Sequence, residues 1–258
     1  MLLLTRLGFA ARGLMYMLVA WLSLRAGRGE DTSGALEYLN GGAGKAILAA
    51  MAIGFFSYGL WRIAAAWLDS EGHGSDRKGL CIRLGGAGSG LIHFGFFYYS
   101  ARLLLGERGG EGSGERAEQG AATALSLPGG QTLVILAAVA LLLVGLYQLY
   151  KAVKGKFLRH LDGRAARQWW VQAAGRLGYA SRGIVFLVVA YFMAKAGLNE
   201  RPGEAGGMAE ALGSLPHTVR IGTAWGLGLF GLFSLVEARH RIIRDPADML
   251  PGNGIGGR

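Results

Sequence analysis

Three basic side chains stand at corresponding positions in three similar stretches of the chain, and they are the first candidates for chemistry. Arg25, Arg102 and Lys195 each lie twelve residues after the last glycine of a recurring motif. If they face a common axis, they form a positive ring suited to an anion or an acidic headgroup. If they face lipid, each is an anchor whose charged end reaches the membrane surface. Anchoring alone is enough to explain basic residues at helix ends.

Three more ionisable residues lie inside apolar stretches. Arg12 and Arg182 are about two turns into theirs, where an arginine costs less than the ~2.5–3.5 kcal/mol of the membrane centre. They can bind carbonyl groups at helix C-termini or a lipid phosphate, which are structural roles, or they can line a solute path. His93 lies near the middle of its stretch. It is a candidate proton relay, or a neutral histidine that is hydrogen-bonded to a neighbouring helix.

The sequence lacks the patterns that accompany catalysis. It contains no His-x-x-x-His or Cys-x-x-Cys pair for a metal, no Gly-x-Ser-x-Gly motif and no phosphate-binding loop. Cys81 is the single cysteine, which excludes an internal disulfide framework. Glu237 precedes Arg241 by four residues, the spacing of an ordinary surface pair on a helix. We therefore expect no enzyme, no catalytic residue, no metal and no cofactor.

Six apolar stretches carry these candidates, and each is about as long as a membrane-spanning helix. Hydrophobic residues make up 52% of the 258 residues, charged residues only 17%, and the mean hydropathy is +0.32. A soluble domain with so few charges could not cover its surface. The stretches are roughly residues 7–26, 45–67, 84–105, 131–150, 177–196 and 219–236. Because about 20 residues cross ~30 Å of hydrocarbon, the sequence predicts an all-α membrane protein with six transmembrane helices.

Two short motifs occur three times and define internal repeats. The odd-numbered stretches open with RLGFAARG at 6–13, RLGGAGSG at 83–90 and RLGYASRG at 176–183, and the even-numbered ones share YGLW at 58–61, VGLY at 144–147 and FGLF at 230–233. Within a single transmembrane domain, 1–258, we expect three parallel two-helix repeats at about 5–68, 82–155 and 175–243. A pseudo-threefold axis along the membrane normal would relate them. The recurring glycines are expected to permit close helix packing: Gly13, Gly59, Gly90, Gly145, Gly183 and Gly231.

Charge is distributed unequally between the two sides of the predicted helix bundle. The side with both termini and the second and fourth loops holds 18 of the 27 Lys/Arg and 7 of the 17 Asp/Glu. Because positive residues favour the cytoplasm, both termini are predicted to be cytoplasmic. The net charge of +10 then requires no nucleic acid.

The basic aromatic linker at about 154–176 concentrates this bias. We expect it to lie on the membrane surface, with its charges toward anionic phospholipid and its rings at headgroup level. A topological anchor without lipid specificity is the alternative. The residues concerned are Lys154, Lys156, Arg159, Arg164, Arg167, Trp169 and Trp170, interleaved with Phe157, Leu158 and Leu161. The loops on the other side are rich in Gly and Glu, and residues 109–115 are typical of a flexible linker.

The motifs resemble those of the bacterial membrane family known as domain of unknown function 1206. The similarity includes the openings of the odd-numbered stretches, the segments at 74–80 and 154–162 and the threefold repetition, and it covers nearly the whole chain. The middle copy departs from the pattern, with Gly86 and Ser89 in place of an aromatic residue and an arginine. The resemblance implies a six-helix integral membrane protein of bacteria, which we expect to be multi-pass in the cytoplasmic (inner) membrane. It implies no activity.

Two functions are compatible with these features. The first is a non-enzymatic scaffold, accessory or lipid-interacting protein, whose partners are the lipid bilayer, anionic phospholipid, and another membrane protein or a second copy of the chain. Its support is the glycine packing, the basic linker and the expected lack of a deep charged pair. The second is a small transporter or channel with a path along the pseudo-threefold axis. The direction of the three outer basic side chains and of His93 distinguishes the two.

Overall fold

The computed structural model describes residues 2–69, 72–107 and 112–242, which form ten α-helices and two short 3₁₀ helices. Six helices are long: α1 (Leu2–Ala26), α3 (Gly44–Leu68), α4 (Arg77–Leu104), α6 (Gly130–Lys154), α8 (Trp169–Asn199) and α10 (His217–His240). The short elements are α2 (Thr32–Tyr38), α5 (Ser113–Leu125), η1 (Lys156–His160), α7 (Gly163–Ala166), η2 (Pro202–Glu204) and α9 (Met208–Ser214).

All six long helices are apolar enough to cross a membrane. The shortest, α10, has 24 residues, which at ~1.5 Å per residue span ~36 Å. That length exceeds the ~30 Å of hydrocarbon in a bilayer. The prediction of an all-helical chain with six long apolar spans is therefore confirmed.

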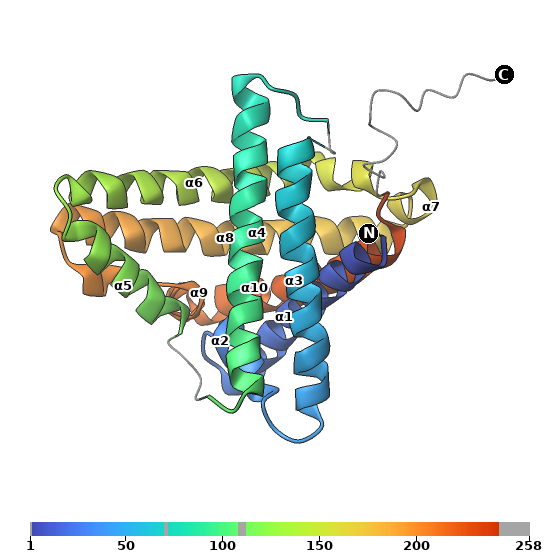
Figure 1. Ribbon diagram of the computed structural model, residues 1–258, viewed down its shortest axis with the longest axis horizontal. Coiled ribbons are helices and arrows are strands. Elements are labelled where there is room, and N and C mark those ends of the chain that lie inside the picture. Colours follow the sequence, from blue (N-terminus) through green and yellow to red (C-terminus); the bar gives the residue numbers. More distant parts are fainter. Residues whose placement is uncertain (1, 70–71, 108–111, 243–258) are drawn as a thin grey trace.

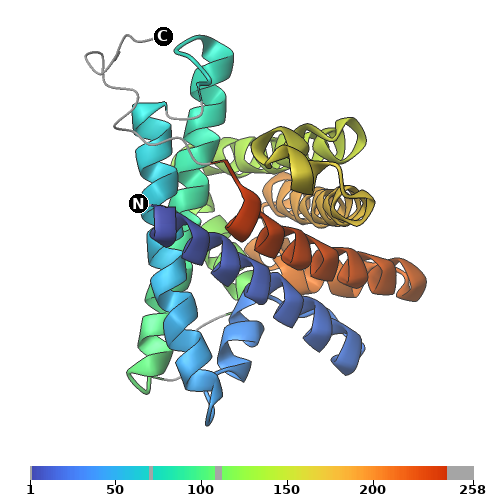
Figure 2. The same ribbon diagram turned by 90° about the vertical axis from the view of Figure 1, so that its right-hand side faces the viewer.

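The long helices pack in pairs that join one repeat to the next. Figure 1 shows α3 beside α4 and α6 beside α8, with the two pairs running across each other. Figure 2 shows α1 alongside α10. The last long helix therefore packs on the first, and the chain closes on itself.

Equivalent glycines lie at the crossings of all three pairs. The glycine pairs are Gly13 with Gly231, Gly59 with Gly90, and Gly145 with Gly183, and a Cβ built on the first of each would lie 2.8, 3.0 and 3.2 Å from the carbonyl oxygen of the second. These distances are shorter than ordinary Cβ contacts. The backbones approach this closely because glycine has no side chain.

Within a repeat, the two long helices pack together in the first and third copies but not in the second. α1 packs on α3 and α8 packs on α10, whereas α4 and α6 make almost no contact. A Cβ built on Gly8 would lie 2.9 Å from the Cα of Tyr58, and one built on the equivalent Gly178 would lie 2.6 Å from the Cα of Phe230. A Cβ built on the third equivalent, Gly85, would meet no other described atom within 4 Å. The ring of helices is therefore open between α4 and α6.

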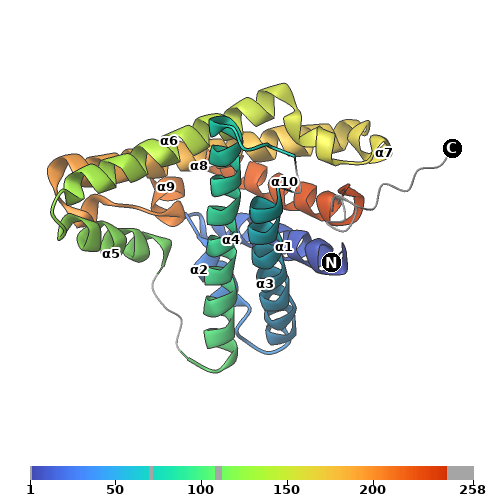
Figure 3. The same ribbon diagram turned by 45° about the horizontal axis from the view of Figure 1, so that its top comes forward.

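The helix ends opposite η1 and α7 are covered by three short helices, α2, α5 and α9 (Figure 3). The Ser113 N–H donates to Asp31 Oδ2 over 2.5 Å, and the Ser113 hydroxyl accepts from the Met208 N–H over 3.0 Å. Leu36 of α2 and Leu212 of α9 are fully buried. The three loops thus interlock and cover this end of the core.

The flexible linker expected at 109–115 lies only partly within the described residues. Residues 109–111 lie outside the described residues. Residues 113–115 form the first turn of α5, so the expectation is wrong for that part.

Candidate functional site

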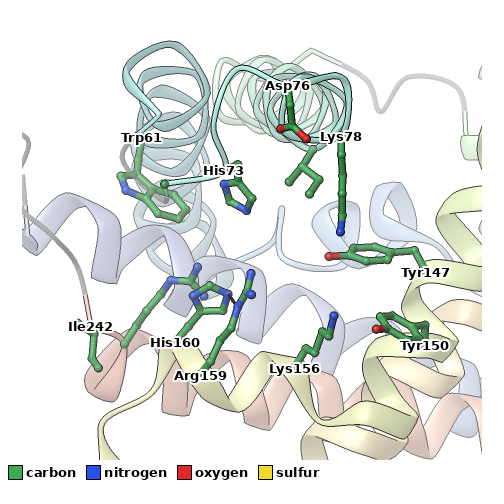
Figure 4. A pocket seen from close by; sticks show the side chains of 13 residues that line it. Trp61, His73, Asp76, Lys78, Tyr147, Tyr150, Lys156, Arg159, His160 and Ile242 are labelled. Atoms are coloured by element: carbon green, nitrogen blue, oxygen red, sulfur yellow. Dashed lines mark hydrogen bonds between the residues drawn. The ribbon is translucent and has the colours of Figure 1, made fainter.

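A cavity of about 710 Å³ lies between α3, α4, α6, η1 and the end of α10 (Figure 4). Most of its charged or titratable lining groups can carry positive charge: Lys78, Lys156, Arg159, Arg241, His73 and His160, against the carboxylate of Asp76. In Figure 4 the ammonium groups of Lys78 and Lys156 point into the opening, as do the hydroxyl groups of Tyr147 and Tyr150. We name this site the basic cavity.

Two aspartates hold the residues just before α4 and its first turn in place at the basic cavity. Asp69 ends α3 with a left-handed backbone, and its carboxylate accepts the N–H groups of His73 and Gly74 over 2.8 and 2.7 Å. These bonds favour the charged carboxylate, so the pKa of Asp69 is lowered. Asp76 caps α4 by accepting the N–H of Gly79 over 3.0 Å. Together the two residues set His73 in the cavity wall and start α4 beside it.

A buried ring anchors η1 and leaves its charges outside. Phe157 is 2% exposed and lies between aromatic rings of α8 and α10, at centroid distances of 5.1 and 5.0 Å. Lys156 and Arg159 are exposed, since a 3₁₀ helix of three residues per turn puts them on other faces. The expectation that Phe157 lies at headgroup level is wrong. Phe157 and the similarly buried Leu161 belong to the protein core.

The other residues predicted to face lipid headgroups are exposed. They are Lys154, Lys156, Arg159, Arg164, Arg167, Trp169 and Trp170. Lys156 and Arg159 also line the basic cavity, so the exposed basic surface continues into it.

Asp162 ties the linker to the end of α10. Its carboxylate accepts the Ala165 N–H over 2.8 Å and pairs with the His240 ring over 2.8 Å. Both contacts favour the charged form, so the pKa of Asp162 is lowered.

A buried ion pair lies within the long helices, next to the basic cavity. Arg12 Nη2 donates to Glu237 Oε2 over 2.5 Å, and the two side chains are 9% and 2% exposed. Arg12 also donates to the hydroxyl groups of Tyr58, over 2.9 Å, and Ser234, over 3.2 Å. Glu237 Oε1 accepts from Arg241 Nη1 over 2.6 Å, and Arg241 lines the cavity. The carboxylate of Glu237 therefore forms ion pairs with two arginines.

This pair corrects two expectations. Glu237 and Arg241 do pair, but their side chains are only 2% and 9% exposed, so this is not a surface pair. A deep charged pair exists where none was expected, and Arg12 binds a carboxylate rather than carbonyl groups or lipid. The sequence contains a signal for it, because Glu237 is the sole acidic residue within the six long helices as described. Such a residue requires a partner inside the membrane.

Three further cations lie in the long helices near this pair. Lys151 interacts electrostatically with Arg62, Arg182 and Glu237. Each cation lies over an aromatic ring, at 4.5 Å for Arg182, 4.7 Å for Lys151 and 5.5 Å for Arg62. Cation–π contacts replace part of the lost hydration but supply no negative charge. Within the long helices as described, basic residues therefore outnumber the one acidic residue, Glu237.

His93 is hydrogen-bonded within its own helix. The residue is 7% exposed, and its Nδ1 lies 2.7 Å from the carbonyl oxygen of Ser89. Because a carbonyl only accepts, Nδ1 carries the proton and Nε2 is an acceptor. The buried Nε2 has no hydrogen-bond partner in the described structure, and the ring packs on Tyr58 at 4.3 Å between centroids. The expected bond to a neighbouring helix is therefore not found.

Arg25, Arg102 and Lys195 lie near the C-terminal ends of α1, α4 and α8, and each has a local contact. Arg25 lies over a tryptophan ring of its own helix at 5.2 Å. Arg102 pairs with Glu107, and Lys195 pairs with Glu204 over 3.5 Å. The side chains of Arg102 and Lys195 are 40% and 46% exposed. The structure gives each residue a local partner and does not join the three into a ring, which favours the anchor interpretation.

Six long apolar helices, a cover of short helices at one end and a basic cavity at the other define a multi-pass α-helical membrane protein. The model of the family described as Domain of Unknown Function (DUF1206) matches residues 7–69, 84–155 and 177–241. The chain belongs to this family, and the match confirms both the resemblance and the three tandem segments.

One relative is similar over most of its length. It is the "Uncharacterized protein YxxB" of Bacillus subtilis (strain 168), with 30% identity over 246 residues, 90% of this chain and 88% of the relative. No solved structure matches the chain.

Proposed function

We propose that this chain is a non-enzymatic, lipid-interacting protein of the bacterial cytoplasmic membrane that binds the phosphate of an anionic phospholipid in the basic cavity. The observation that carries the proposal is the charge of the cavity lining, with four Lys/Arg side chains and one carboxylate. Phosphate oxygens accept several charge-assisted hydrogen bonds, for which lysine and arginine are the usual donors. A zwitterionic headgroup adds a positive charge of its own, so the excess favours an anionic lipid.

In this proposal the basic cavity and both chain ends face the cytoplasm. The support is the concentration of basic residues around the cavity, because cytoplasmic segments carry the excess of Lys/Arg and the cytoplasmic leaflet carries anionic lipid. The exposed rings of Trp169 and Trp170, 77% and 40% accessible, suit the headgroup level of the same leaflet.

We place the three repeats around a pseudo-threefold axis along the membrane normal. The equivalent glycines at the crossings α1/α10, α3/α4 and α6/α8 support this cyclic order. The near absence of contact between α4 and α6 breaks the symmetry at one place. The basic cavity lies at that break, since Lys78 belongs to α4 and Tyr150 to α6.

A small transporter is the second candidate. The cavity opens at one end of the helices, while α2, α5 and α9 interlock at the other, an arrangement that suits a carrier open to one side. The core contains the fully buried Phe55 and Phe230, which argues against a continuous channel. Uptake by proteoliposomes of a solute that empty liposomes exclude would favour this candidate.

Two double variants that remove the same charge test the proposed lipid site. Lys156→Gln/Arg159→Gln removes two cations from the cavity lining. Arg164→Gln/Arg167→Gln removes two exposed cations of the same linker that do not line the cavity. The full-length chain is purified in detergent, and the binding of phosphatidylglycerol and phosphatidylcholine is measured by native mass spectrometry.

The cavity variant should lose more phosphatidylglycerol than the control variant. A hydrogen bond to a charged group contributes about 1.5–3 kcal/mol. The affinity of the cavity variant for phosphatidylglycerol should therefore be lower than that of the control variant by about 10-fold or more. Phosphatidylcholine binding should be the same in both variants. An equal loss of phosphatidylglycerol in the two variants would show that the linker attracts lipid without a defined site.

A further inference from the structure

In the first and third repeats, a pair of aromatic residues joins the two long helices. The second repeat lacks this pair. The pairs are Phe9 with Tyr58 and Tyr179 with Phe230, at ring-centroid distances of 5.2 and 5.3 Å. The repeated motifs place Gly86 and Val144 at these positions in the second repeat. The second repeat therefore has no rings at these positions to hold α4 against α6.

Parts of the surfaces that would meet in the second repeat are uncovered, although Gly86 itself is buried beside Arg62 of α3. Tyr58 and Phe230 are 4% and 0% exposed, but Val144 is 42% exposed. A Cβ built on Gly85 or on Gly88 would meet no other atom within 4 Å among the described residues. In the other two repeats the equivalent positions touch the partner helix. We define the slot as the space between Gly85 and Gly88 of α4 and Val144 of α6.

The slot lies next to the basic cavity along both helices. Ile82 precedes Gly85 by three residues, Tyr147 follows Val144 by three, and both Ile82 and Tyr147 line the cavity. Three residues are slightly less than one helical turn, which rises ~5.4 Å. An apolar slot thus lies about one turn from a positively charged cavity. A phospholipid has the same order of groups, with a charged phosphate followed by apolar chains.

We infer that the slot holds an acyl chain of the anionic phospholipid whose phosphate lies in the basic cavity. This inference rests on the proposed headgroup binding and adds the place of the lipid tail. The hydrocarbon region of a bilayer contains no water to fill a space between two helices, so lipid chains fill it. Protein side chains fill the equivalent space in the other two repeats. The lipid therefore completes the ring of helices between α4 and α6.

One leucine substitution tests the slot against a matched control. Gly85→Leu places a side chain in the slot, and Gly222→Leu places the same side chain on α10. Both glycines are exposed, and a Cβ built on either would meet no other described atom within 4 Å, so each position has room at the start of a side chain. The full-length variants are purified in detergent, and the binding of phosphatidylglycerol and of inorganic phosphate is measured.

Gly85→Leu should weaken phosphatidylglycerol binding by about 10-fold or more relative to Gly222→Leu, because the added side chain occupies the place of the acyl chain. Binding of inorganic phosphate, which does not reach the slot, should be the same in both. Equal phosphatidylglycerol binding by the two variants would overturn the inference that the slot holds an acyl chain. The headgroup site would still stand if Lys156→Gln/Arg159→Gln weakened binding.

Two other results would also overturn the inference. Inorganic phosphate that binds as tightly as phosphatidylglycerol would identify the ligand as a free anion without a tail. A disulfide that forms readily in Gly88→Cys/Val144→Cys, made with Cys81→Ser and kept in lipid membranes, would show that α6 itself closes the slot.

Discussion

Replacing Glu237 should reveal how the charged interior of this protein is stabilised. The Glu237→Gln variant keeps the shape of the side chain and removes its charge. Arg12 and Arg241, now bound over 2.5 and 2.6 Å, would both lose this carboxylate. A glutamine offers one acceptor oxygen, and its amide group points N–H donors at the second guanidinium.

The expected size of the effect comes from the burial of the pair. Removing one partner of a buried ion pair costs about 3–5 kcal/mol. The lower end applies, because Arg12 keeps its bonds to the hydroxyl groups of Tyr58 and Ser234. The Arg12→Met variant should cost less, about 1–2 kcal/mol. It removes the buried cation together with its bonds and leaves Glu237 paired with Arg241.

Thermal unfolding in detergent measures the relative stability of the two variants. For a chain of this size about 1 kcal/mol shifts the midpoint by roughly 2–4 °C, so Glu237→Gln should melt about 6–12 °C below the unsubstituted chain and Arg12→Met should fall between the two. Two results would refute the assignment of one carboxylate to two arginines. One is a Glu237→Gln midpoint within about 2 °C of that of the unsubstituted chain. The other is an Arg12→Met midpoint lower than that of Glu237→Gln.

Three other substitutions, the first with a matched control, have defined outcomes. Gly231→Ala should cost about 1–3 kcal/mol, because its Cβ would lie 2.6 Å from a carbonyl oxygen of α1, whereas Gly85→Ala should leave the melting temperature unchanged. His93→Phe removes a buried acceptor without a hydrogen-bond partner among the described residues and should leave the chain as stable or about 1 kcal/mol more stable; a large loss of melting temperature would contradict this. Asp162→Asn removes a carboxylate whose pKa is lowered from 3.8 by its native contacts, including that with His240. Its charged form stabilises the fold above about pH 4, so the difference in melting temperature from the unsubstituted chain should be present at pH 7 and disappear below that pH.

The elements of this protein could be predicted well because their signals are local. An apolar stretch of sufficient length forms a membrane helix regardless of its neighbours, and a motif that recurs three times marks the repeats directly. The short helices α2, α5 and α9 were missed because Gly and Glu suggest a linker. What orders them is contact between different loops, such as that of Ser113 with Asp31.

The candidate site could be predicted only in part. Lys156 and Arg159 were expected to meet lipid because they lie in a basic, exposed linker. The cavity that they line also needs α4 and the end of α10, so no single segment indicates it. Phe157 was placed at the membrane surface because composition alone does not show which face of a short helix is buried.

By itself, the sequence determined the six spans, the three repeats and the family, since each depends on residue types within a few turns of chain. Only the tertiary structure decided that Arg12 meets Glu237, 225 residues away, and that the second repeat stays open. Both outcomes depend on which helices pack together. The first arises because α10 returns to pack on α1. The second arises because Gly86 and Val144 provide no rings to hold α4 against α6.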